Sequence, residues 1–258
     1  MREVIVKIGP FTVYGYGLMI AIGVVAAFWV AMYREKKYKV GDDHVFYAGI
    51  WCLVMGWVFA KVLYLITELP DILKDPSQFW AALKGNGFVV YGGLIGGILT
   101  GWVYAKVKKL PFLKYFDLVM PSIALAQGFG RLGCLMAGCC YGRVTDSAFH
   151  IVFPESCRFA PGGVPLIPTQ LISSAANFLN FFLLILLAKR TKAPGQVGGL
   201  YLIFYSVGRF LIEFLRDDPR GAVGVLSTSQ CIAIFTFLAG IAVFVICGKR
   251  KKEQAEEE

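Results

Sequence analysis

Gly128–Arg143 reads GFGRLGCLMAGCCYGR and ends a long apolar run with Arg131, three cysteines and five glycines. A lipid-facing helix would carry Leu and Val at these positions. A charged side chain at the centre of a membrane helix costs about 2.5–3.5 kcal/mol on insertion scales, so Arg131 needs a stabilising partner. Asp117, the carboxylate that immediately precedes this run, would lie about 21 Å away along a helix.

The composition indicates an integral membrane protein. The 258 residues are 57% hydrophobic and only 17% charged, and the mean hydropathy is +0.63, which is too apolar for a soluble domain. No cleavage signature follows the first apolar run, so we expect that run to be retained. The net charge of +9 lies in short clusters between apolar runs, a pattern of membrane topology rather than of nucleic-acid binding.

Seven apolar runs are long enough to cross a bilayer, which predicts an all-α fold with seven transmembrane helices. The runs are 10–32, 45–67, 88–105, 118–140, 169–188, 197–215 and 229–247. Most basic loop residues fall on one side: Arg34, Lys36, Lys37, Lys39, Lys106, Lys108, Lys109, Lys114, Lys189, Arg190, Lys192, Lys249, Arg250, Lys251 and Lys252. The positive-inside rule then places the N-terminus outside and the C-terminus in the cytoplasm.

The remaining segments complete a single polytopic domain over 1–258. We expect a surface arm at about 68–87, a small external head at about 142–167 and a disordered charged tail at about 249–258. The two halves show no repeat, which counts against an inverted-repeat transporter.

Three basic residues lie inside the predicted spans, and all three fall in the outer half of the bilayer. At the helical rise, Arg131, Arg209 and Lys61 lie about 20, 18 and 24 Å from the inner ends of their helices. Tyr16 and Tyr91 lie within about 10 Å of the outer surface. We interpret Lys61 as a side chain that snorkels to the interface.

Helical spacing groups some of these residues on shared faces. Gln127, Arg131 and Cys134 follow i, i+4, i+7, and Tyr205, Arg209, Glu213 and Arg216 follow i, i+4, i+8, i+11. Glu213 can pair with either neighbouring arginine; if it neutralises Arg216, Arg209 is free. Two embedded guanidiniums favour an anion, and the abundant anion at this depth is a lipid phosphate.

Other motifs indicate packing. Gly92/Gly96 and Gly93/Gly97 form two small-xxx-small registers, typical of close helix contact. Seven cysteines and only two histidines, His44 and His150, show no metal-ligand spacing. We therefore expect no metal and no cofactor.

Several motifs together resemble the bacterial prolipoprotein diacylglyceryl transferases over nearly the whole chain. The motifs are 16-YGLM-19, 91-YGGLIGG-97, 130-GRLGC-134 through 141-YGR-143, 168-PTQL-171 and 208-GRFLIEFLR-216. The resemblance implies an enzyme of the bacterial plasma membrane, active at the outer leaflet. It would transfer the diacylglyceryl group of phosphatidylglycerol to the lipobox cysteine of a preprolipoprotein signal peptide and release glycerol 1-phosphate.

The same resemblance implies roles for individual residues. Arg131 would hold the lipid phosphate, Arg209 would stabilise the leaving group or activate the acceptor, and Tyr16 and Tyr205 would orient the headgroup. The remaining implied binding residues are Cys134, Gly142 and Gln170, and the structural ones are Gly92, Gly93, Gly96, Gly97, Glu213 and Arg216. We expect a monomer, with membrane lipids as its other partners.

The chain departs from the family pattern at two positions: Tyr91 replaces a histidine and Cys134 an asparagine. The general base is therefore open between Tyr91, the lipid phosphate and a lowered pKa of the incoming thiol beside Arg209. Two other readings remain, a relative acting on another anionic lipid or acceptor and a non-enzymatic lipid-binding or transport protein. A disulfide from Cys157 to Cys139 or Cys140 is a further hypothesis; inert thiols are the alternative.

Overall fold

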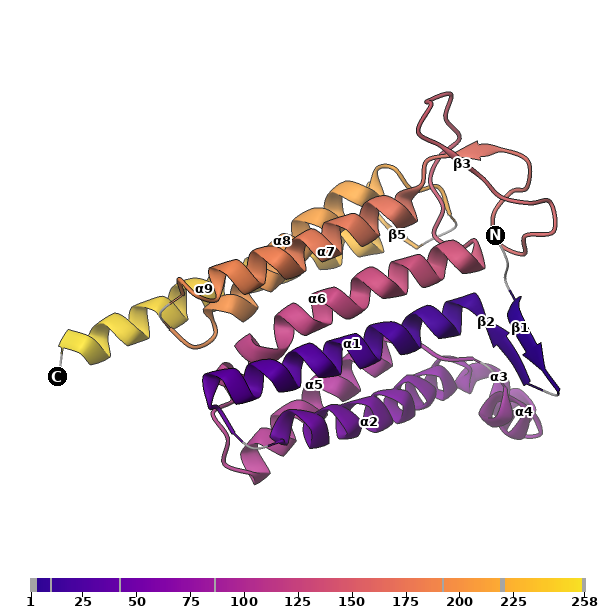
Figure 1. Cartoon of the computed structure of the whole chain (residues 1–258). Coiled ribbons are helices and arrows are strands. Elements are labelled where there is room, and N and C mark those ends of the chain that lie inside the picture. The colour runs from indigo at the N-terminus through magenta and orange to yellow at the C-terminus, as the bar shows by residue number, and fades with distance from the viewer. Residues whose placement is uncertain are drawn as a thin grey trace. The chain divides into compact units, whose positions relative to one another are not determined.

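The computed structural model describes residues 4–9, 11–41, 43–85, 87–191, 193–218 and 221–256. Long helices dominate it (Figure 1). The chain divides into two compact units, one formed by Met1–Tyr33 with Phe116–Glu258 and the other by Arg34–Tyr115. We call them unit 1 and unit 2. The organisation of 1–258 as one polytopic domain remains a prediction.

Among the described residues, unit 1 holds most of two long helices and all of three others, together with three short antiparallel strand pairs. The helices are α1 (Gly15–Tyr38), α6 (Phe112–Ala137), α7 (Thr169–Leu187), α8 (Gln196–Glu213) and α9 (Thr228–Glu256). The strands are β1 (Val4–Ile8), β2 (Phe11–Tyr14), β3 (Ile151–Val152), β4 (Pro165–Leu166), β5 (Ala222–Val223) and β6 (Leu226–Ser227), paired in antiparallel order. Unit 2 contains α2 (His44–Thr67), α3 (Leu69–Lys74), α4 (Gln78–Lys84) and α5 (Val90–Val107).

Five of these helices are long and apolar enough to cross a membrane: α1, α2, α6, α7 and α9. Their number and length agree with a multi-pass membrane protein. Two further predicted spans coincide with α5 and α8, which do not reach the same apolar content over the described residues. Glycines lower the hydropathy of α5, and Arg209 and Glu213 lower that of α8.

The predicted helices and the structure differ at the two ends of the chain. Residues 11–14, expected to begin the first span, form β2, because apolar and β-branched side chains on both sides of Gly9 favour a hairpin. Gly9 has φ 58°, a conformation that suits glycine. At the other end, the tail predicted to be disordered continues α9 as helix through Glu256, whereas 257–258 lie outside the described residues.

The helices of unit 1 are tied together by a carboxylate cap and by close backbone contact. Asp117 of α6 accepts hydrogen bonds from the amides of Gly195 and Gly198, at 2.7 and 2.8 Å, and so caps the start of α8. Helices α8 and α9 run side by side (Figure 1), and Ser206 and Thr236 share a hydrogen bond of 2.6 Å between them. These contacts fix α8, which carries Arg209.

In unit 2, α2 and α5 pack closely through glycines of α5. A Cβ on Gly92 would lie 2.4 Å from the Phe59 carbonyl oxygen, one on Gly93 3.3 Å from that of Gly56, and one on Gly96 2.6 Å from Phe59 Cβ. Gly97 differs, since a Cβ there would meet nothing within 4 Å.

Lys61 does not snorkel, so that prediction is wrong. The residue is 7% exposed, and its ammonium donates hydrogen bonds to the carbonyls of Gly85 and Gly87 at 2.7 and 3.2 Å. It also lies over the rings of Tyr64 and Phe88. These acceptors satisfy the charge within unit 2 and hold the end of the segment that contains α3 and α4.

The loop between α6 and α7, predicted as a head, has a small core of its own. Phe153, Ala160 and Leu166 are buried together, and Leu135 of α6 packs against them. The β3–β4 pair and a bridge between Val144 and Leu166 hold the loop together.

Candidate active site

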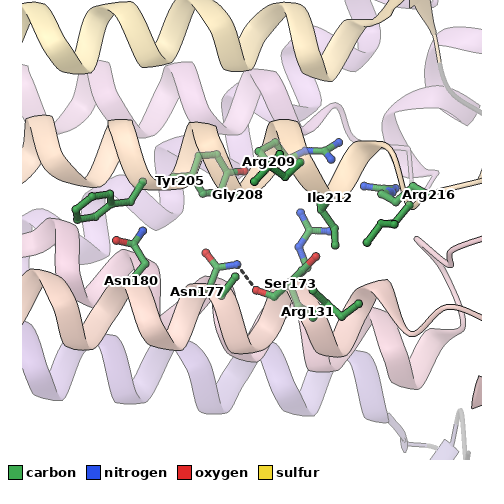
Figure 2. A pocket seen from close by; sticks show the side chains of 14 residues that line it. Arg131, Ser173, Asn177, Asn180, Tyr205, Gly208, Arg209, Ile212 and Arg216 are labelled. Carbon is green, nitrogen blue, oxygen red and sulfur yellow. Dashed lines mark hydrogen bonds between the residues drawn. The ribbon is translucent and has the colours of Figure 1, made fainter. Parts of the chain in front are cut away.

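A pocket of about 250 Å³ lies in unit 1 between α7 and α8 and is reached by Arg131 from α6 (Figure 2). Arg131, Arg209 and Arg216 give one part of it three guanidinium groups. Asn177, Asn180 and Tyr205 line it further along the two helices, among apolar side chains. A pocket with cations in one part and neutral polar groups in another suits an amphiphile with an anionic group.

Arg131 supplies a positive charge that no carboxylate neutralises among the described residues. Its Nη1 donates a weak hydrogen bond to the Cys140 sulfur at 3.8 Å. The other guanidinium hydrogens can therefore serve an anion in the pocket. This matches the expectation that Arg131 has no partner on its own helix.

Arg209 forms an ion pair with Glu213. The helical spacing alone had left open whether Glu213 pairs with Arg209 or with Arg216. Its Nη1 donates to the Glu213 carboxylate one helical turn on, and its Nη2 donates to Ser229 Oγ at 2.6 Å. Arg216 instead makes a two-pronged ion pair with Asp218, with distances of 2.8 and 2.6 Å. Glu213 therefore forms its ion pair with Arg209, one helical turn away, while Arg216 pairs with Asp218.

Two buried amides of α7 complete the pocket, and the sequence analysis missed them. Asn177 donates to the Ser173 carbonyl at 2.8 Å. Asn180 is 5% exposed, and neither its nitrogen nor its oxygen has a hydrogen-bond partner among the described residues. Ser173, Asn177 and Asn180 are spaced i, i+4, i+7, so a polar face on an otherwise apolar helix was the signal available in the sequence.

After α6 the chain forms a tight turn that brings Cys134, Cys139 and Cys140 together. Thr169 Oγ1 donates to the Cys140 carbonyl at 2.7 Å and Gln170 Nε2 to the Cys139 carbonyl at 2.9 Å.

The predicted disulfide is not formed. All seven cysteines lie among the described residues, and all are free thiols. The sulfur of Cys157 lies against Gly138 instead, where a Cβ would be 2.2 Å from it.

Comparison with known proteins identifies the family. The family model "Prolipoprotein diacylglyceryl transferase" matches residues 3–246. This chain belongs to the prolipoprotein diacylglyceryl transferase family. The family resemblance read from the motifs is therefore confirmed.

Relatives that carry the name phosphatidylglycerol–prolipoprotein diacylglyceryl transferase match over all or nearly all of their length. One from Clostridium tetani is 44% identical over 98% of this chain and 100% of its own. A second, from Clostridium perfringens, is 43% identical over 100% of both chains. One from Clostridioides difficile is 33% identical over 96% of this chain and 98% of its own.

The site residues implied by the diacylglyceryl transferase family fall into two groups in the structure. Arg131, Tyr205 and Arg209 line the pocket. Tyr16 is outside that lining but lies beside α6, where a Cβ on Gly133 would be 3.2 Å from its ring. Tyr91 belongs to unit 2, at the start of α5, and is 47% exposed.

Three other residues implied by the transferase family lie outside the pocket lining, at or beside the backbone turns next to it. Gln170 donates to the turn that follows α6, and Cys134 lies near the end of α6 with its sulfur beside those of the turn. Gly142 pairs with Arg216 at the end of α8 and accepts no Cβ, which would lie 2.6 Å from the Ile167 carbonyl oxygen. Their contact with substrate remains a prediction.

Proposed function

We propose that this protein transfers the diacylglyceryl group of phosphatidylglycerol to the lipobox cysteine of a preprolipoprotein. The activity is the one named for full-length relatives at 43–44% identity. The observation that carries the assignment to this pocket is Arg131, a guanidinium facing the cavity without an ion pair among the described residues.

The lipid would lie along the pocket with its phosphate at the arginines. Arg131 grips a phosphate oxygen through free N–H groups, and Arg209 approaches the same group with its charge partly balanced by Glu213. Asn180 lies about two helical turns along α7 from Ser173, which is next to Arg131 (Figure 2). It offers its amide to an ester carbonyl of the diacylglyceryl group. Tyr205, stacked on Tyr201 with ring centroids 5.8 Å apart, forms a firm wall beside it.

The chemistry is the displacement of a phosphate ester by sulfur. The acceptor thiolate attacks C3 of the diacylglyceryl glycerol, a C–S bond forms, and the C–O bond to phosphate breaks. Glycerol 1-phosphate leaves with the electron pair, and its negative charge is stabilised by Arg131 and Arg209. The thiol proton goes to the lipid phosphate or to solvent, the latter being favoured by a thiol pKa lowered beside Arg209; Tyr91 as the general base stays a prediction.

The wider setting follows from the charge pattern. The protein would span the bacterial plasma membrane seven times as a monomer, with α5 and α8 as the two spans beyond the five described helices that are long and apolar enough by themselves. The pocket would open toward the outer leaflet, where signal peptide and phosphatidylglycerol both arrive.

The decisive experiment uses the full chain in lipid nanodiscs with phosphatidylglycerol and a lipobox peptide. The expected product is a peptide heavier by one diacylglyceryl group on its cysteine, seen by mass spectrometry together with released glycerol 1-phosphate. A peptide with serine in place of the lipobox cysteine is the matched control and should gain nothing.

The same assay separates the alternatives. Lipid binding without any modified peptide would support a non-enzymatic lipid carrier and overturn the proposal. Modification only with another anionic lipid would assign the protein to a different donor.

A further inference from the structure

Three thiols meet beside the pocket although the sequence does not space them like a metal motif. The sulfur atoms of Cys134, Cys139 and Cys140 all lie within 4.8 Å of one another. Adjacent side chains on an extended strand point in opposite directions. Cys140 avoids this because its φ is 61°, a left-handed conformation that is uncommon outside glycine.

The turn is held by groups outside it. The carbonyls of Cys139 and Cys140 accept hydrogen bonds from Gln170 and Thr169 of α7, both of which are buried. The Cys139 amide bonds to the Cys134 carbonyl at 3.1 Å and closes the end of α6. A strained residue that its surroundings hold firmly is a feature of functional sites.

We propose that Cys134, Cys139 and Cys140 form a binding site for a thiophilic divalent cation, with Zn²⁺ as the physiological candidate. Tetrahedral zinc with Zn–S bonds of about 2.3 Å places its sulfur ligands about 3.8 Å apart. The three sulfurs thus need only small rotations to reach that geometry. With three protein ligands the fourth position is left to water or to a ligand from outside.

The groups around the three cysteines favour binding of the cation by thiolates. Arg131 donates to Cys140 Sγ, so its positive charge stabilises a cluster that would carry a net negative charge with zinc and three thiolates bound. Cys157 is the fourth cysteine of this region and lies outside the cluster. The inference concerns metal binding alone and does not depend on the transferase activity.

The first test titrates purified full-length protein in detergent with Cd²⁺, under a non-thiol reductant, and follows the ultraviolet sulfur-to-cadmium charge-transfer absorption. We expect one Cd²⁺ per chain, with Zn²⁺ in excess competing for the same site. Cys139→Ser and Cys140→Ser should each weaken binding at least about tenfold, since even changes beyond the ligands cost that much. Cys157→Ser, the matched control, should bind as the parent does.

The second test needs no substitution and so does not depend on the variants folding. The parent protein is alkylated with and without Cd²⁺, and each cysteine is quantified by peptide mass spectrometry. Cd²⁺ should protect Cys134, Cys139 and Cys140 at least about tenfold and leave Cys157 unprotected. Equal alkylation of the three with and without the metal, or absorption that survives in both serine variants, would overturn the proposal.

Discussion

Arg131 is the side chain whose loss should affect transfer most, because it is the pocket guanidinium without an ion pair among the described residues. A hydrogen bond to a charged group contributes about 1.5–3 kcal/mol, so Arg131→Ala should lower the rate of diacylglyceryl transfer about 10- to 100-fold. Arg131→Lys should recover only part of it, because an ammonium cannot grip phosphate bidentately. The nanodisc assay measures both.

The matched control is Arg158→Ala, which removes an arginine from the exposed surface of the loop between α6 and α7, where it lies over the Phe159 ring. That variant should transfer at the parental rate. Full activity of Arg131→Ala would remove Arg131 from the site.

Asn180 should show opposite effects on stability and on activity. Its amide is buried without a partner, so Asn180→Leu removes an unsatisfied polar group that costs about 1–3 kcal/mol. The variant should therefore unfold at the same or a higher temperature than the parent. Transfer should fall about tenfold, because the lipid ester loses its hydrogen-bond partner. A loss of both stability and activity would instead mark Asn180 as structural.

Which site residues the sequence could reveal depends on how costly each residue is in a membrane. The sequence revealed Arg131 and Arg209 because a charged side chain inside an apolar run has a high free-energy cost and therefore indicates a function. Asn180 was overlooked because one amide in such a run costs far less and does not stand out. The cysteine cluster was also missed, since it depends on the backbone conformation of Cys140, which spacing does not show.

At the level of elements, hydropathy located the long helices well because each is a continuous apolar run. The run at 45–67 became α2 at His44–Thr67, and the run at 169–188 became α7 at Thr169–Leu187. The β1–β2 hairpin was missed because its residues are as apolar as the helix that follows. The helical end of α9 was missed because a charged tail shows no apolar period.

The contact between α2 and α5 can be tested with two glycines on one helix. A Cβ on Gly92 would lie 2.4 Å from the Phe59 carbonyl oxygen, whereas one on Gly97 would meet nothing within 4 Å. Gly92→Ala should destabilise unit 2 by about 1–3 kcal/mol through overpacking. Gly97→Ala should stabilise it by about 0.5–1 kcal/mol, because alanine favours the helix.

Thermal unfolding in detergent, followed by circular dichroism, compares the two variants with the parent. The midpoint should fall for Gly92→Ala and stay level or rise for Gly97→Ala. Equal shifts in both would mean that α2 and α5 do not pack through Gly92.

For the whole molecule, the open question is whether α5 and α8 cross the membrane. Both lie in predicted spans, yet neither is among the five described helices that are long and apolar enough to cross a membrane. Each can nevertheless be stable in a bilayer if neighbours cover its polar side: α5 presents Gly92 and Gly96 to α2, and α8 packs closely on α9. The Arg209–Glu213 pair further reduces the cost of burying α8.

Truncations fused to reporters distinguish seven spans from five. With seven, alkaline phosphatase should be active after Ser147, and green fluorescent protein should fluoresce after Lys109 and Thr191, which follow basic clusters. With five, all three results reverse, because the chain fails to cross at α5 and again at α8. Fusions at Asp75, outside, and at the C-terminus, inside, give the same result in both cases and serve as controls. A reversed pattern would place the loop between α6 and α7 in the cytoplasm and exclude an outer-leaflet site.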